Sequence, residues 1–287
     1  MNVAIGLFIT LTLFCTMLAL GLSLHSEALR RWCQQPALPL RVLLGSCLLV
    51  PLLAWLLLQT PWSFQITQPS RFAIALMALC PSAPLALRRA RQGGGDHQLA
   101  ALVQVAAAIA AIVTVPLLGL AFRQTFGVSG WEVRPLDVAL QVGRVQVLPL
   151  LLGLALRHGQ PRFAEALESP LHRLANLLLL VLVALVLIKT GPLLLSFAAA
   201  NLPALLQMAL LVLATLLVGR LLAAGQAAEH GGTTALVTAM RNPGLALLFA
   251  SHHGQALPGL KLAILSYVLV TLLVSTAWLR LSQRLWS

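Results

Sequence analysis

The chain is a succession of long apolar segments separated by short loops that carry arginine. A bilayer core of about 30 Å needs roughly 20 residues of helix, and the lipid offers no partner for unpaired backbone groups. Nine segments meet this requirement, at residues 3–24, 39–59, 71–88, 98–122, 136–157, 171–189, 202–222, 233–251 and 258–281. None of them alternates with the period of two that is typical of barrel strands. The sequence therefore predicts an all-α polytopic membrane protein with nine transmembrane helices.

Composition excludes other classes of protein. Charged residues make up 9% of the chain and hydrophobic residues 59%, and the mean hydropathy is +0.92, so the chain has too little charge to solvate a soluble domain. The net charge of +12 does not indicate a nucleic-acid partner, because the arginines lie in short loops between the apolar segments. We expect a single integral membrane domain over residues 1–287, with the lipid bilayer as its partner. No arrangement of nucleophile and base and no metal-binding spacing is present, so we expect neither an enzyme nor a metal site.

The loops differ in basic charge, which predicts the orientation in the membrane. If the N-terminus is outside, twelve of the 19 basic residues lie at cytoplasmic ends and five lie outside. Positive charge is retained on the cytoplasmic side, so this asymmetry favours an inner (plasma) membrane protein with its N-terminus outside and its C-terminus in the cytoplasm. The remaining two basic residues, Arg144 and Arg241, lie inside predicted spans.

Two segments 160 residues apart resemble each other. Residues 75–87 read ALMALCPSAPLAL and residues 235–247 read ALVTAMRNPGLAL, and both have helix-breaking residues in the middle. Because five spans separate the two copies, they cross the membrane in opposite directions. The sequence therefore predicts an inverted-topology repeat of residues 1–122 (spans 1–4) and 171–287 (spans 6–9), joined by the span at 136–157.

The breaks in the two copies predict new helix starts inside the membrane. Asn242 followed by Pro243 suits an N-cap and a first helical position, and Ser82 can cap a matching half-helix that begins near Ala83-Pro84. Two half-helix N-termini would then meet near the middle of the bilayer, each with a partial positive charge. The alternative is a pair of proline kinks without a site.

The charges near the breaks indicate the kind of ligand. All seven acidic residues lie in predicted loops or at the ends of spans, whereas Arg241 costs about 2.5–3.5 kcal/mol at a helix centre and should face a cavity or a partner. A small organic anion is the natural ligand of such a site. The alternative role of Arg241 is structural, as a donor to the carbonyls that the break frees. The predicted substrate-binding residues are Ser82, Ala83, Pro84, Gln104, Thr238, Arg241, Asn242, Pro243 and Gly244. Of these, Gln104 and Thr238 could instead simply bond neighbouring helices.

Several motifs resemble the bile acid:sodium symporter family. "MLALGLSL" (17–24) is similar to the Gly-Leu-Thr-Leu end of an early family span, and "VPLLAWLL" (50–57) to its Pro-x-x-Ala-Trp segment. "ALCPSAPLA" and "RNPGLA" stand where the family has Cys-Pro-Gly-Gly and Gln-Asn-x-Gly-Leu-Ala. The resemblance implies a core domain with two crossing broken helices and a panel domain that contains the helix at 136–157. Nine spans then correspond to the ten-helix family fold without its first helix.

The chain departs from the family at the positions that bind sodium in its members. Carried over residue by residue, the family's sodium ligands fall on Ser46, Ala86, Leu87, Ala100, Gln104, Val237 and Arg241. Few of these side chains can bind a cation, so Na⁺ remains a possible cofactor whose usual ligands are mostly missing.

Together these features predict a secondary active transporter that moves a small organic anion by alternating access, with sodium coupling doubtful. Two alternatives stay open at this point. One is a sodium-coupled organic anion symporter whose Na⁺ ligands are mostly backbone carbonyls, and the other is a receptor-like member of the family that does not transport.

Overall fold

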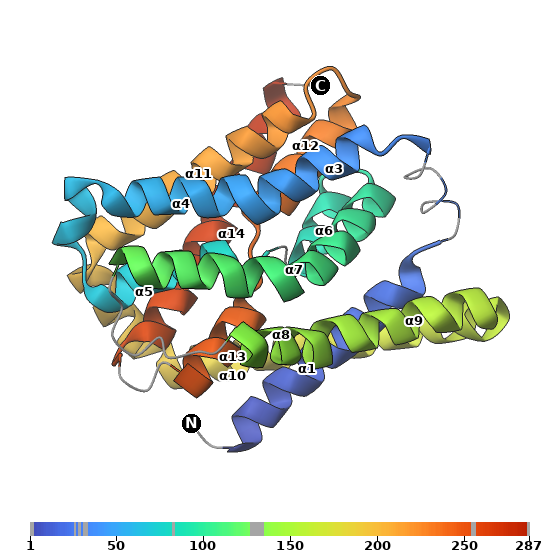
Figure 1. Ribbon diagram of the computed structural model, residues 1–287, viewed down its shortest axis with the longest axis horizontal. Coiled ribbons are helices and arrows are strands. Elements are labelled where there is room, and N and C mark those ends of the chain that lie inside the picture. The colour runs from blue at the N-terminus through green and yellow to red at the C-terminus, as the bar shows by residue number, and fades with distance from the viewer. Residues whose placement is uncertain are drawn as a thin grey trace.

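The computed structural model describes residues 3–25, 27, 30, 34–81, 84–126, 135–253 and 257–285, and every element in these ranges is a helix (Figure 1). The predicted all-α class is therefore confirmed. The elements, in chain order, are α1 (Val3–Ser23), α3 (Ala37–Leu44), η1 (Gly45–Leu49), α4 (Val50–Gln59), η2 (Pro61–Gln65), α5 (Gln68–Leu79), α6 (Pro84–Gln92), α7 (His97–Phe126), α8 (Pro135–Val142), η3 (Gly143–Val147), α9 (Leu148–Gly159), α10 (Pro161–Ala200), α11 (Leu202–Leu222), α12 (Ala228–Ala239), α13 (Pro243–His253) and α14 (Leu260–Leu285).

Six helical segments of the described residues are long and apolar enough to cross a bilayer: Gly6–Ser23, Ala37–Gln59, His97–Phe126, Ala139–Gly159, Leu202–Leu222 and Leu260–Ser282. Two more of the predicted spans, 71–88 and 233–251, are each divided into two shorter helices, as their helix-breaking residues indicated. The count of nine spans and the inverted repeat stay predictions.

The helix α10 differs from the predicted span at 171–189, because it runs without interruption for 40 residues from Pro161 to Ala200. Pro170 lies just before the predicted span, and Pro192 lies just after it. Proline removes only one backbone hydrogen bond, and neighbouring groups can satisfy the freed carbonyl in a membrane helix. Here the helix continues through both prolines.

Two spans contain a π-helical turn that the sequence pattern did not predict. The turn η1 joins α3 to α4, and η3 joins α8 to α9. Each is followed by a proline at the second residue of the next helix, Pro51 and Pro149. Proline lacks an N–H and its ring crowds the carbonyl four residues before it, so a locally widened turn keeps the helix continuous.

The helices pack as two groups. In the smaller group α1 lies along α9 and α10, and in the larger group α11 packs on α12 and α14, α5 on α4 and α14, and α7 on α6 and α12 (Figure 1). A buried cluster that includes Cys15, Ala19 and Ala175 holds α1 against α10. The largest buried cluster fills the larger group and reaches α1 through Met17 and Leu20.

Two glycines allow α1 and α9 to approach closely. A Cβ atom added at Gly153 would lie 2.9 Å from Cα of Gly21 and 2.9 Å from the backbone nitrogen of Leu22, and it would also collide with the carbonyl oxygen of Leu18. Small residues at a crossing let two membrane helices make backbone contact, which is the main source of helix association in lipid. The helices α1 and α9 are therefore packed backbone to backbone at these glycines.

Charged side chains connect the helices of this group at the end that is predicted to be cytoplasmic. Arg157, near the end of α9, lies 3.3 Å from Glu168 and 3.7 Å from Glu165, both on α10. It also contacts the imidazole of His25, which follows α1. All three helices of the smaller group are thus connected through one buried guanidinium.

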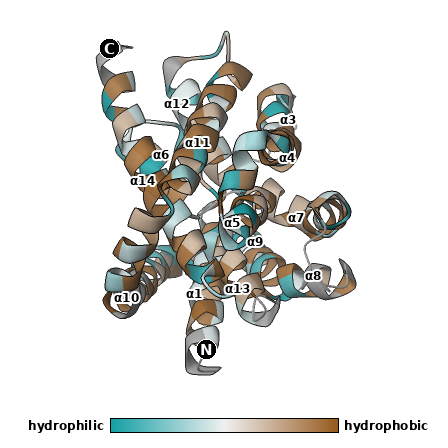
Figure 2. Cartoon of the chain, turned by 90° about the vertical axis from the view of Figure 1, so that its left-hand side faces the viewer, coloured by the Kyte–Doolittle hydropathy of each residue, from teal (hydrophilic) through white to brown (hydrophobic). Residues whose placement is uncertain are grey.

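The outer faces of the helices are apolar. Figure 2 shows hydrophobic residues along the outward sides of the helices, and exposed large side chains include Leu52, Leu117, Leu180 and Leu195. A water-soluble protein does not expose so much aliphatic surface over the length of its helices, whereas lipid tails cover it without cost. This surface is the one that the bilayer contacts.

Candidate functional site

The first feature of the site is the pair of interrupted spans. The helix α5 ends at Leu79 and α6 begins at Pro84, while α12 ends at Ala239 and α13 begins at Pro243. The carboxamide oxygen of Asn242 accepts a hydrogen bond from the backbone N–H of Leu245 at 3.1 Å, so the predicted N-cap and the predicted start of α13 are confirmed. Of the matching residues in the first break, Ser82 and Ala83 lie outside the described residues.

The two breaks meet each other. The backbone N–H of Asn242 donates to the carbonyl oxygen of Cys80 at 3.1 Å, which joins the two interruptions directly. In addition α5 packs on α13, and α12 packs on α6. Each half-helix therefore contacts the opposite half of the other span, and the two broken spans cross.

Arg241 lies at this crossing, with only 3% of its surface exposed. Its Nε donates to the carbonyl oxygen of Met77 at 3.2 Å, and its Nη2 donates to that of Ala78 at 2.5 Å. Its Nη1 donates to Oγ of Ser46 at 2.9 Å and to the carbonyl oxygen of Thr238 at 3.4 Å. Both breaks and η1 therefore supply oxygen atoms to one guanidinium.

These contacts realise the structural role that the sequence left open for Arg241. The last carbonyls of a helix have no intrahelical partner, and an unpaired carbonyl inside a membrane costs several kcal/mol. The guanidinium satisfies carbonyls at the end of α5 and compensates part of its own desolvation. Contact between Arg241 and a ligand stays a prediction.

Ser46 reaches the crossing from the π turn η1. Ser46 is buried within η1, and its Oγ accepts the hydrogen bond from Arg241. Nothing in the local sequence indicated that a serine and an arginine 195 positions apart would share a hydrogen bond. The presence of Pro51, which favours a local distortion of the preceding turn, is the signal that could have drawn attention to this segment.

The structure brings most of the other predicted residues to the same region. Thr238, at the end of α12, is buried, and the start of α13 at Gly244 contacts the side chain of Leu13 on α1. A Cβ atom at Gly244 would lie 2.7 Å from Leu13, so this residue lets α1 pack against the break. Arg144, by contrast, is exposed on η3.

Gln104 lies on the wall of a cavity between the two groups of helices. The cavity has a volume of about 130 Å³. It is bordered by Thr16 on α1, by Leu85 and Leu87 on α6, by His97 and Gln104 on α7, and by His172 and Asn176 on α10. Within the part of the chain that the structure describes, neither the nitrogen nor the oxygen of the Gln104 carboxamide has a hydrogen-bond partner. The expectation that this side chain bonds a neighbouring helix is therefore not met by the described residues.

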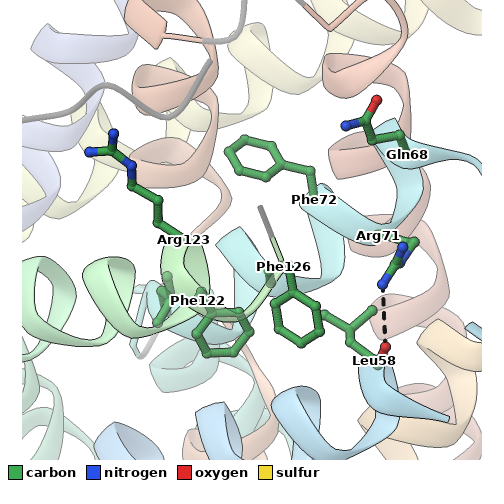
Figure 3. Close-up of a pocket in the computed structure, with 9 residues that line it drawn as sticks. Leu58, Gln68, Arg71, Phe72, Phe122, Arg123 and Phe126 are labelled. Carbon is green, nitrogen blue, oxygen red and sulfur yellow. Dashed lines mark hydrogen bonds between the residues drawn. The ribbon is translucent and has the colours of Figure 1, made fainter. Parts of the chain in front are cut away.

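A second cavity, of about 50 Å³, lies at the other end of α7 (Figure 3). Arg71 on α5 donates to the carbonyl oxygen of Leu58 at 3.4 Å, and its guanidinium lies 4.7 Å from the ring centre of Phe64 and 5.8 Å from that of Phe126. Such cation–π contacts hold a charged side chain against an apolar surface. This small cavity therefore lies between the ends of α4, α5 and α7.

Comparison with known proteins gives the family. The profile of the Sodium Bile acid symporter family matches residues 10–197, which is more than half of the chain. No curated protein matches the chain closely. The matched residues include the first broken span and the residues of both helix groups that border the cavity beside Gln104. The second broken span follows them in the sequence. The chain therefore belongs to the sodium bile acid symporter family of membrane transporters, as the sequence motifs indicated.

Proposed function

We propose that this protein is a secondary transporter that moves a small organic anion across the inner membrane by alternating access, and that it does so without sodium. The observation that carries the proposal is the buried guanidinium of Arg241 at the crossing of the two broken spans. Its fixed positive charge favours an anion near the crossing and disfavours a metal cation there.

The surrounding side chains support the absence of sodium coupling. Val237, Ala86, Leu87 and Ala100 stand where the resemblance places sodium ligands, and all four are buried apolar side chains without oxygen atoms. Sodium, like other hard cations, needs several oxygen ligands. At the crossing, a cation could use the backbone carbonyl oxygens of Met77 and Ala78 and the hydroxyl oxygen of Ser46. These three oxygens already accept hydrogen bonds from Arg241.

The arrangement of the helices supports alternating access. The α1–α9 contact and the charged cluster around Arg157 make the smaller group a unit, and the hydrogen bonds of Arg241 connect both breaks within the larger group. The cavity beside Gln104 lies between these two units. A rocking motion of one unit against the other would open this space to either side in turn, as in other transporters with broken helices.

The test is a screen of organic anions for thermal stabilisation of the purified protein, in sodium chloride and in choline chloride of equal concentration. We expect at least one small carboxylate to raise the melting temperature by the same amount in both salts. Uptake of that carboxylate into proteoliposomes should then be equal with and without a sodium gradient. Stabilisation or uptake that requires sodium would support the sodium-coupled alternative, and a protein that no anion stabilises would support the receptor-like one.

A further inference from the structure

The small cavity between the ends of α4, α5 and α7 lies at the surface that contacts lipid. All of its lining residues belong to the larger group of helices, so it lies apart from the space between the two groups. Leu56 on α4 and Leu117 on α7 are exposed large apolar side chains that the bilayer covers. A hydrogen bond from Nε1 of Trp55 to Oγ1 of Thr125 at 3.2 Å connects these two helices near the cavity. A ligand of this cavity therefore reaches it from the bilayer or from its surface.

Three features give the cavity a positive potential. Arg71 and Arg123 both border it, and they lie on either side of a group of phenyl rings (Figure 3). The helix α5 begins at Gln68, which also borders the cavity, and no side chain caps this helix, so its N-terminal partial positive charge lies at the same end. Among the residues that the structure describes, no acidic side chain borders the cavity. The cavity therefore favours an anion.

The side chain of Arg71 is held at the cavity. An arginine near the end of a membrane helix ordinarily extends its charged group into the water. Arg71 is instead half-buried, donates to the carbonyl oxygen of Leu58, and lies against the rings of Phe64 and Phe126. Among the described residues this bond uses one N–H group of the guanidinium, and the other N–H groups remain for a ligand.

The cavity is polar at one end and apolar at the other. Arg71 lies in the first turn of α5, and Ala75 and Leu79 follow it at intervals of four residues on the same face of this helix. The volume of about 50 Å³ has room for roughly four water-sized groups, which excludes a whole organic solute. A membrane lipid matches this arrangement, because its anionic head lies at the bilayer surface and its apolar chains stay within the bilayer.

We propose that the cavity between the ends of α4, α5 and α7 binds an anionic phospholipid of the leaflet that surrounds these ends. Arg71 and Arg123 attract the phosphate, and methylene groups of an acyl chain cover Ala75 and Leu79. The phosphate of a soluble molecule has the same chemistry, but the lipid is favoured because the neighbouring helix faces are covered by the bilayer. This inference goes beyond the proposed function and does not depend on it, because no transported substrate enters the argument.

The test is a titration of the purified, delipidated full-length protein with phosphatidylglycerol or phosphatidylcholine of the same acyl chains, followed by native mass spectrometry. The choline group cancels the net charge of the second lipid, so we expect phosphatidylglycerol to bind at least about tenfold more tightly. Each arginine near an anionic lipid contributes about fivefold in affinity. Arg123→Gln should therefore weaken binding of phosphatidylglycerol about fivefold, and the double variant with Arg71→Gln should weaken it about thirtyfold.

Two further variants serve as controls. Arg280→Gln makes the same substitution at an exposed arginine at the opposite end of the predicted spans, and it should keep the wild-type affinity for phosphatidylglycerol. Arg123→Lys keeps the charge and should keep the affinity as well. If Arg71→Gln does not yield folded protein, the comparison of Arg123→Gln with Arg123→Lys decides.

Four results would overturn the inference. They are equal binding of the two lipids, wild-type affinity in Arg123→Gln, an equal loss of affinity in Arg280→Gln and Arg123→Gln, and displacement of the lipid by inorganic phosphate. The last is measured with ammonium phosphate against ammonium acetate of equal ionic strength. Displacement by phosphate alone would identify a site for a soluble anion, whereas a lipid that stays bound in both salts supports the phospholipid site.

Discussion

Replacing Arg241 by methionine should destabilise the protein, because it removes the group that holds the two broken spans together. The substitution deletes four hydrogen bonds, to Met77, Ala78, Thr238 and Ser46. Bonds from a charged donor contribute about 1.5 kcal/mol each at the lower end of their range, which gives about 6 kcal/mol. Removing the buried charge also removes an unfavourable free energy of about 3 kcal/mol, the cost of placing arginine inside the membrane. The net decrease in the free energy of unfolding is therefore about 3 kcal/mol.

Thermal unfolding in detergent, followed by intrinsic fluorescence, measures this effect. At roughly 2–3 °C per kcal/mol for a chain of this size, Arg241→Met should lower the melting temperature by about 6–9 °C. Arg144→Met is the matched control, since it removes the other arginine inside a predicted span, at an exposed position on η3, and should change the melting temperature by less than about 2 °C. Equal melting temperatures for the two variants would refute the argument that Arg241 ties the breaks together.

Three further predictions concern packing, capping and topology. Gly153→Ala should lower the melting temperature by several degrees, because its methyl group collides with the backbone of α1, whereas Gly191→Ala in an open part of α10 should raise it slightly. Asn242→Ala should cost about 1 kcal/mol through loss of the cap on α13, seen as a drop of roughly 2–3 °C, and an unchanged value would contradict the capping role. In a cysteine-free background, a cysteine at exposed Gln59 should react with an impermeant maleimide from outside the cell, and one at exposed Gln92 only after permeabilisation. The reverse labelling pattern would show that the predicted orientation is wrong.

The positions of the two breaks could be predicted from local sequence because they depend on local chemistry. Proline has no backbone N–H and a fixed φ angle, so Pro84 and Pro243 mark the first residues of new helices. The Asn242 side chain caps its own helix three residues on, which needs no other part of the chain. Long apolar segments likewise predicted the helical class, since a backbone in lipid has few other options.

Other features could not be predicted, because they depend on competition between local signals and distant contacts. The prolines in α10 carry the same local signal as those at the breaks, yet α10 continues through them. The π turns η1 and η3 arise from prolines that a simple periodic pattern treats as ordinary span residues. In both cases the same residue type has different effects in different surroundings.

The sequence by itself therefore determined the helical class, the family motifs and the places where the spans are interrupted, because each follows from the residues at that place. Only the tertiary structure decided where Arg241 directs its hydrogen bonds and which partners Gln104 has. Arg241 donates to the carbonyls of Met77 and Ala78, because the crossing brings these two carbonyls within its reach. Gln104 could have bonded a neighbouring helix, but the packing of α7 places no hydrogen-bond partner for its amide among the described residues. The direction of a polar side chain inside a membrane is set by which oxygen and nitrogen atoms the fold places around it, and those atoms come from segments far away in the sequence.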